Sequence, residues 1–378
     1  MKKIIAAGLI ALSCAFSTLF AFSWSGVVDN SSKLLANHDF SQLTLEQSNG
    51  VYLSFSSNLN QAGNLRIAGE GLYKYYLYCP FNGGSLTFKN VADIDLLKFT
   101  GDWKLKSGSL SVNLGRFQYS DFTGAVFNQI TDGAYISYNT LKIKTSIYAG
   151  YTGLLNRLNV SMAENTSSST DQVYALCPQY VPVAADISYK ALFETNTIGF
   201  QAMCFIPVTN ANTLKAYGTI SMNGSFGTIG SYNAKVTVGT EKFTSIMLDA
   251  KLDTNFYVNK NIMVTAGGEY VSGTQGSIKP FLSITARSFG YAPFVNGIIV
   301  PKAGVMFVKD KFYGNLTERI ILAMPSDQLS FNGFDTTVNL IYNLFSDVQL
   351  GCDIAAYICT ERKENSRFYT TIKASLAF

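Results

Sequence analysis

The segment Arg367–Phe378 reads Arg-Phe-Tyr-Thr-Thr-Ile-Lys-Ala-Ser-Leu-Ala-Phe and ends the chain on an aromatic residue. Its side chains alternate between a more apolar and a more polar set, which is the period of a β-strand. A strand that is apolar on one face and polar on the other fits the wall of a barrel, with an edge strand of a soluble sheet as the alternative. The apolar set is Phe368, Thr370, Ile372, Ala374, Leu376 and Phe378, and the other set is Tyr369, Thr371, Lys373, Ser375 and Ala377.

The amino terminus predicts export. Lys2 and Lys3 precede an apolar stretch, Ile4–Phe20, and Ala21-Phe22-Ser23 is a small-residue cleavage site. These features predict a signal peptide over residues 1–23, with cleavage after Ala21 as a second option. A lipoprotein signal at Cys14 is the alternative.

The composition favours a membrane barrel. Hydrophobic residues make up 47% of the chain and charged residues only 14%, against roughly 25% charged in an ordinary soluble domain. The 22 Tyr and 27 Phe suit aromatic girdles at the two membrane interfaces, although a β-sandwich core could also use them. The predicted mature chain has no apolar run of eighteen residues, which excludes membrane-spanning helices.

Period-two alternation extends over most of the chain. In Asp95–Lys106, Leu97, Phe99, Trp103 and Leu105 alternate with polar or charged residues, and 141–151 repeats this pattern. The sequence therefore predicts an all-β fold: a transmembrane antiparallel up-and-down β-barrel of about 16 strands, within a range of 14 to 18. Further alternating segments are 187–193, 214–220, 232–238, 246–252, 334–344 and 348–358.

The barrel is assigned to residues 50–378, and residues 24–49 are interpreted as an N-terminal lead, a short plug or a first strand. The order of short and long connections is inconsistent with the strands drawn between Gly273 and Pro301, so one element there is misassigned. Long polar connections are expected outside the cell. They are 79–94, 120–132, 152–186, 323–333 and 360–366.

Two segments carry a family resemblance. The last strand resembles the closing strand of bacterial outer-membrane β-barrels, in which a terminal Phe and preceding apolar residues are recognised by the assembly machinery; Phe368, Leu376 and Phe378 match it. Ser111–Tyr138, with Gly115-Arg116-Phe117-Gln118, resembles a segment of bacterial porins. The resemblance implies a porin-type barrel in the cell outer membrane, and a loop at this place that narrows the lumen. By that resemblance Arg116, Tyr119 and Asp121 lie near the constriction. The alternative pairs Arg116 with Asp121 or Asp132 on an extracellular rim.

Residues for catalysis are sparse. His38 is the single histidine, which weighs against His-dependent triads and His metal sites. The five cysteines after the predicted signal lack Cys-x-x-Cys spacing, so zinc is not expected, and a Cys79–Cys177 disulfide is one option. No enzyme activity, metal, cofactor or nucleic-acid partner is predicted.

The predicted lumen carries an excess of lysines, which favours mild anion selectivity. We therefore expect a porin for passive diffusion of small hydrophilic solutes, with the lipid bilayer as partner and a homo-oligomer left open. Two alternatives remain: a plugged barrel for hydrophobic substrates, similar to fatty-acid transporters, and a surface-exposed adhesin or structural barrel acting through 152–186. The lysines assigned to the pore are Lys98, Lys104, Lys106, Lys142 and Lys144.

Overall fold

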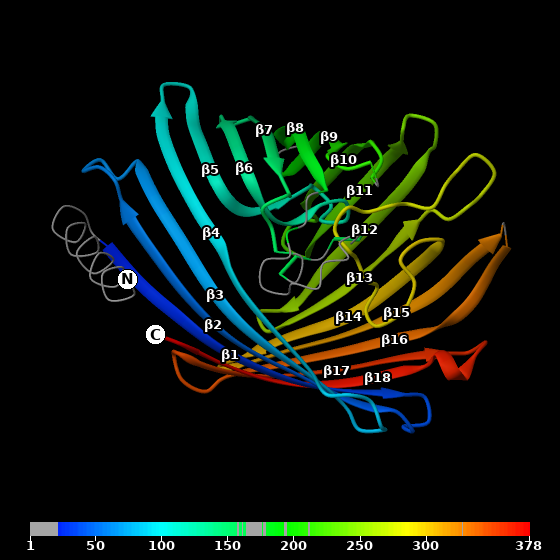
Figure 1. Cartoon of the computed structure of the whole chain (residues 1–378). Coiled ribbons are helices and arrows are strands. Elements are labelled where there is room, and N and C mark those ends of the chain that lie inside the picture. The colour runs from blue at the N-terminus through cyan, green and yellow to red at the C-terminus, as the bar shows by residue number, and fades with distance from the viewer. Residues whose placement is uncertain are drawn as a thin grey trace.

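The computed structural model describes residues 22–156, 159–160, 162–163, 176, 179–192, 195–210, 212–326 and 328–378. They form one antiparallel sheet of 18 strands that closes on itself (Figure 1). Each strand pairs with the next along the chain, and the first pairs with the last. The strands are β1 (Phe22–Asn37), β2 (Leu43–Asn58), β3 (Leu65–Pro80), β4 (Thr87–Leu105), β5 (Gly108–Ser120), β6 (Asn128–Asn139), β7 (Ile143–Tyr151), β8 (Tyr180–Leu192), β9 (Asn196–Pro207), β10 (Lys215–Ser225), β11 (Gly230–Glu241), β12 (Met247–Asn259), β13 (Ile262–Val271), β14 (Ile298–Lys309), β15 (Phe312–Ser326), β16 (Gln328–Asn343), β17 (Val348–Cys359) and β18 (Arg367–Ala377).

The predicted antiparallel barrel is confirmed, and its strand number is 18, the upper end of the expected range rather than 16. Residues 22–37 form β1 and residues 43–58 form β2, so the segment left open as a lead, a short plug or a first strand lies in the wall. Residues 272–297 form a single connection between β13 and β14. With this assignment the connections alternate regularly between the two ends of the barrel, and the two longest, 152–179 and 272–297, lie at the same end. We call that end the long-loop end and the other the short-turn end.

Alternation in the wall separates two environments. On β7, Ile147 is 62% exposed whereas its neighbour Ser146 is 4% exposed. Apolar side chains on the outer face are stable only against lipid. Aromatic side chains cluster near the short-turn end. The centroid of the Trp24 ring lies 4.9 Å from that of Phe22 and 6.0 Å from that of Phe55. This arrangement matches the interfacial girdles of membrane barrels.

The barrel closes between β1 and β18. Val27 is paired with Ala377, and the backbone N–H of Gly26 donates to the Phe378 carbonyl at 2.8 Å. The Phe378 ring lies over Gly26, where an added Cβ would come within 2.3 Å of it. The first described residues and the last residue of the chain therefore meet at the same seam, on the short-turn side (Figure 1).

Residues 1–21, which contain most of the predicted signal peptide, lie outside the described residues. Among the residues that are described, no helix is both long and apolar enough to cross a bilayer.

Candidate functional site

Three connections from the long-loop end fold into the barrel: 121–127, the described parts of 152–163, and 272–297. They bind one another through the backbone, because the N–H groups of Ile284 and Thr285 both donate to the Val126 carbonyl, at 2.8 and 3.1 Å. The N–H of Ala163 in turn donates to the Ile284 carbonyl at 2.9 Å. In Figure 1 the connection between β13 and β14 runs back across the centre of the barrel. The three segments thus form one body inside the lumen, which we call the lumen insert.

The lumen insert packs against the wall like a protein core. Phe127 lies 5.4 Å from Phe205 between ring centroids, and Tyr217 lies 5.9 Å from Phe281. Phe205 and Met247, on the inner face of the wall, are both 0% exposed. Buried aromatic contacts of this kind exclude water, so this side of the lumen is filled.

Asp121 organises the first connection. Its carboxylate accepts hydrogen bonds from the N–H groups of Thr123 at 2.8 Å, Val126 at 3.1 Å and Phe127 at 2.8 Å, and the side chain is 4% exposed. The loop enters the lumen as the porin resemblance implied. Asp121 itself faces its own turn, which it stabilises.

Arg116 is held by two carboxylates. Its guanidinium donates to both oxygens of Asp132, at 2.8 and 2.9 Å, and to Asp93 at 3.1 Å. The carbonyls of Ile94 and Leu154 each accept a further bond at 2.9 Å, and the side chain is 12% exposed. A bidentate pair of this kind fixes position rather than offering a free charge. Of the two acids considered as partners from the sequence, Asp121 and Asp132, the structure pairs Arg116 with Asp132.

Tyr119, the third predicted constriction residue, is part of the packed side. Its ring stacks on Tyr148 with centroids 3.7 Å apart, and it is 7% exposed. Arg116, Tyr119 and Asp121 therefore lie close together along β5 and its loop, but each is engaged in packing or pairing.

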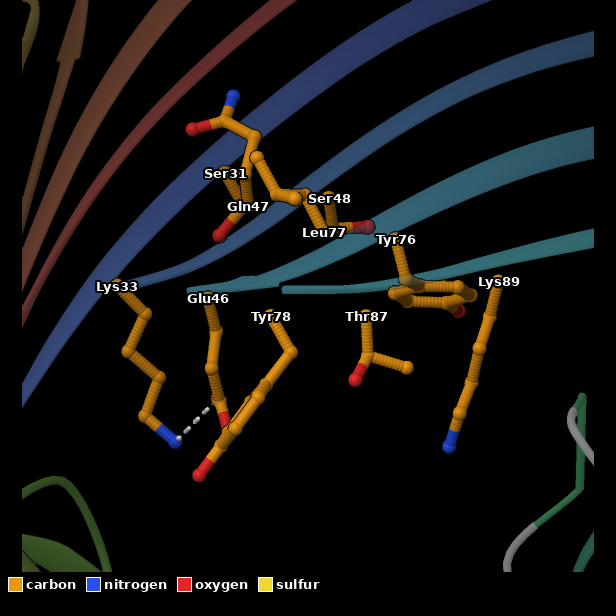
Figure 2. Close-up of a pocket in the computed structure, with 10 residues that line it drawn as sticks. All are labelled: Ser31, Lys33, Glu46, Gln47, Ser48, Tyr76, Leu77, Tyr78, Thr87 and Lys89. Carbon is orange, nitrogen blue, oxygen red and sulfur yellow. Dashed lines mark ion pairs between the residues drawn. The ribbon is translucent and has the colours of Figure 1, made fainter. Parts of the chain in front are cut away.

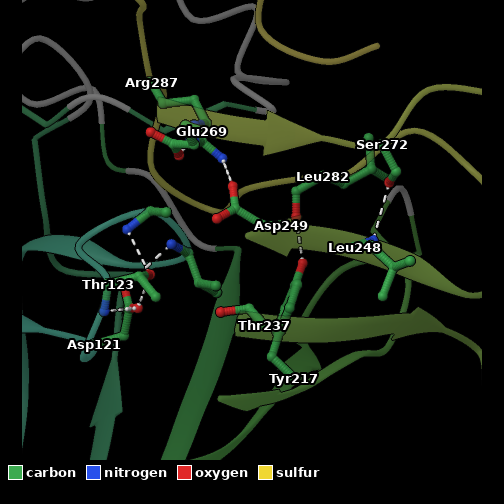
Figure 3. Close-up of polar contacts among 12 residues, drawn as sticks. Asp121, Thr123, Tyr217, Thr237, Leu248, Asp249, Glu269, Ser272, Leu282 and Arg287 are labelled. Carbon is green, nitrogen blue, oxygen red and sulfur yellow. Dashed lines mark hydrogen bonds and ion pairs between the residues drawn. The ribbon is translucent and has the colours of Figure 1, made fainter. Parts of the chain in front are cut away.

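Arg287 anchors the third connection, and sequence reasoning missed it. Its guanidinium donates to Asp249 on β12 at 2.6 Å and also to Glu269 on β13 (Figure 3). The Phe289 ring lies 4.8 Å from the guanidinium. No local pattern around Arg287 signals this role, because both acids come from strands distant in sequence.

The lumen insert reaches two other parts of the wall. The Tyr291 N–H donates to Asp335 on β16 at 2.5 Å, and its ring lies 4.8 Å from Tyr369 on β18. Burial raises the pKa of the Tyr291 phenol, so this hydroxyl is neutral at physiological pH. On the other side, Asn159 donates to Asp93 at 3.2 Å and also to Asp95 on β4. The arc of wall from β1 to β4 lies between these two contacts.

A cavity of about 620 Å³ lies against this arc. Lys33, Glu46, Tyr76, Tyr78 and Lys89 point to the same side of the sheet and bound it (Figure 2). The Lys33 ammonium lies 3.4 Å from the Glu46 carboxylate, and both side chains remain partly exposed, at 31% and 42%. The surface thus offers two cations, one carboxylate and two phenols to a solute. We call it the β1–β4 passage.

A second cavity of about 220 Å³ lies where the lumen insert meets β12–β15. Its cations are balanced by acids: Lys302 lies 2.6 Å from Asp253, and Arg319 lies 2.9 Å from Asp335. This region is therefore a network of ion pairs and carries little net charge.

The five predicted pore lysines occupy two kinds of position. Lys98 and Lys144 lie within strands on the inner, partly buried face. Lys104, Lys106 and Lys142 are exposed at or beside the short turns that follow β4 and β6. Figure 1 places the β4–β5 turn at one rim of the barrel, away from the lumen insert near its centre. These three lysines therefore surround a mouth and are not at the narrowing.

The described residues contain no cluster of three or more His, Cys, Asp or Glu side chains arranged to hold a metal ion. The disulfide considered from the sequence involves Cys177, which lies outside the described residues.

Comparison with known proteins places the architecture. No protein-family model matches the chain, and no curated protein matches its sequence. Among solved structures, Pseudomonas aeruginosa OccK2 (OpdF) in complex with glucuronate has a TM-score of 0.64 and 11% identity, covering 94% of this chain and 96% of that one. Acinetobacter baumannii OccAB4 has a TM-score of 0.62 and 12% identity, with coverage of 94% and 98%.

The fold is that of the Occ porins. Pseudomonas aeruginosa OpdK with vanillate is also similar, with a TM-score of 0.60, 9% identity and coverage of 94% and 98%. The porin-type barrel expected from the last strand and from Ser111–Tyr138 is thus confirmed as a fold. At these identities the likeness is one of architecture.

Proposed function

We propose that the protein is an outer-membrane porin that lets small hydrophilic solutes cross by passive diffusion. The β1–β4 passage carries this proposal, since it is a polar cavity beside a packed lumen insert within a closed barrel. A barrel of 16 to 18 strands is wide enough to hold an aqueous channel. The insert fills one side of that channel and leaves the polar arc as the route.

The size and chemistry of the passage suggest the solute class. A cavity of about 620 Å³ lies within the usual range of about 300 to 1,000 Å³ for small-molecule sites. Two of the similar structures hold small carboxylates, glucuronate and vanillate. In this chain Lys33 and Lys89 would attract a carboxylate, while Glu46 reduces the net attraction. We therefore propose mild anion preference.

The plugged-barrel alternative required residues 26–49 inside the lumen. These residues lie instead in β1, β2 and the turn between them. Their position in the wall supports the diffusion porin over a transporter with an N-terminal plug.

We further propose that β18 presents the signal read by the outer-membrane assembly machinery. Phe368, Leu376 and Phe378 lie on its outer face, and Leu376 and Phe378 are 42% and 65% exposed. Side chains that remain exposed on the closing strand are available to a partner before closure.

Conductance of the purified barrel in a planar bilayer tests the function. We expect discrete openings and a reversal potential, in a salt gradient, slightly toward anions. Lys33→Glu with Lys89→Glu should move that potential toward cations, whereas the matched control Lys363→Glu, in a long loop, should leave it unchanged. A barrel that folds normally in detergent yet never conducts would refute the proposal.

A further inference from the structure

Polar side chains interrupt the apolar outer face of β1 and β2. Asn30 is paired with Asn49, and Ser32 with Gln47, across the two strands. Asn30 donates to Asn49 at 2.6 Å, and Ser32 donates to Gln47 at 2.5 Å. The row continues because Asn49 is paired with Tyr75 on β3 and Tyr75 with Asn90 on β4. We call Asn30, Ser32, Gln47, Asn49, Tyr75 and Asn90 the outer polar row.

The neighbours of the row show that it faces outward. Val28 and Leu34, two residues to either side of Asn30 and Ser32 on β1, are each 41% exposed. Glu46 and Tyr78 bound the lumen cavity, and Figure 2 shows the Gln47 side chain directed to the opposite side of the sheet. The outer polar row therefore contacts the surroundings of the barrel.

The row lies at hydrocarbon depth. Asn30 is six residues from Trp24, which belongs to the aromatic cluster at the short-turn end. Six residues span about 20 Å along a strand, or about 15 Å of depth at a tilt of about 40°. The apolar band of such barrels is about 25 Å tall. Asn30 and Asn49 thus lie well inside it, and Tyr75 and Asn90 lie nearer the long-loop end.

The far side of the barrel differs. The middle of β7, β10 and β11 presents Ile147, Ile220 and Val236 outward, and these are 62%, 54% and 49% exposed. Lipid tails satisfy such side chains fully. The polar side chains at the same depth on β1 and β2 therefore need an environment other than lipid tails.

Lipid cannot complete the hydrogen bonds of the row. Each primary amide carries two N–H donors, and the bonds among the described residues use one from Asn30 and one from Gln47, at 2.6 and 3.5 Å, both to Asn49. Placing an unsatisfied amide in hydrocarbon costs about 2 to 7 kcal/mol. A partner at this depth must itself be a protein surface embedded in the membrane.

We propose that the outer polar row is the contact surface for a second copy of this chain. Amide and hydroxyl groups both donate and accept, so the row can pair with its own copy without bringing like charges together. Four strands at about 4.8 Å spacing, each about 33 Å long where it crosses a band about 25 Å tall at a tilt of about 40°, give roughly 600 Å² per copy. The total of about 1,200 Å² reaches the lower limit of a specific interface. Val51 and Leu53, 40% and 50% exposed, supply apolar packing beside the row.

Thiol cross-linking in native membranes tests the contact. In a chain whose own cysteines are replaced by Ala, Asn49→Cys should give a covalent dimer with a short membrane-permeant bismaleimide. Ile147→Cys, which is also outward and near mid-strand, is the matched control and should stay monomeric. Equal yields at both positions, no dimer from a folded Asn49→Cys barrel, or a product with a chain of another mass would each overturn the proposal.

A second variant separates association from folding. Gln47→Leu with Asn49→Leu should keep heat-modifiable gel mobility and single-barrel conductance, because apolar side chains suit this face, yet lose the oligomer seen by native mass spectrometry. The control variant Thr145→Val, on the outer face of β7, should retain the oligomer. Wild-type barrels that are monomeric in lipid nanodiscs, or a double variant that associates normally, would refute the inference.

Discussion

The orientation of the wall predicts opposite costs for neighbouring positions on β11. Val236 is 49% exposed on the outer face, and Lys235 beside it faces inward. Val236→Arg places a charge near the middle of the apolar band, where the cost is about 2 to 4 kcal/mol. At 1.4 kcal/mol for each factor of ten, the unfolding equilibrium shifts by about 30- to 700-fold. Thr240→Arg, on the same face near the strand end, should cost only about 0 to 1 kcal/mol.

Reversible guanidinium unfolding in lipid vesicles measures this difference. Trp24 and Trp103, at 63% and 37% exposure on the outer face, report insertion through their fluorescence. Both variants must show the same native spectrum for the comparison to be valid. Equal free energies of unfolding for the two arginine variants, or a larger loss at Thr240, would refute the assignment of the lipid-facing side.

Three further outcomes follow from the seam, the lumen insert and the charged mouths. Deleting Phe378 removes the ring and the two backbone bonds to Gly26, so the protein should fail to acquire heat-modifiable mobility and should be degraded in the periplasm. Arg287→Met leaves two acids without their cation and should free the third connection, which raises single-channel conductance and current noise. Lys104→Glu at the mouth should shift the reversal potential less than Lys89→Glu in the β1–β4 passage, and both shifts should shrink as salt rises because screening strengthens.

Each of these outcomes has its control. Phe378→Tyr keeps an aromatic terminus and should assemble. Lys279→Met alters the same connection away from the Arg287 ion pairs and should leave conductance unchanged. Normal surface exposure after the Phe378 deletion, or unchanged conductance in a folded Arg287→Met barrel, would contradict the corresponding role.

Alternation in sequence was sufficient to predict the barrel. It did not assign two regions correctly, the first two strands and the connection 272–297, and each has a physical reason. On β1 and β2 the outward Asn30 and Gln47 remove the apolar face by which a wall strand is recognised, so the sequence leaves a lead, a plug and a first strand open for this region. In the connection 272–297, Phe281 and Ile284 are buried against the wall at 2% exposure each. Apolar residues of a packed loop therefore imitate a strand.

The candidate site depended on contacts that sequence does not contain. The porin-like segment correctly predicted that the loop after β5 enters the lumen. It could not show that Arg116 is neutralised by Asp93, which lies on a different strand. Lys33 and Lys89 were not singled out, because only the register of four strands brings them to one cavity.

The seam between β1 and β18 sets the timing of biogenesis. Val27 and Ala377 are partners, so the sheet cannot become a cylinder until nearly the last residue has been delivered to the membrane. Until then two strand edges with unpaired backbone groups persist, and such edges recruit foreign strands. The open sheet therefore needs protection until β18 arrives, and a chain that lacks β18 leaves the edge of β1 unpaired.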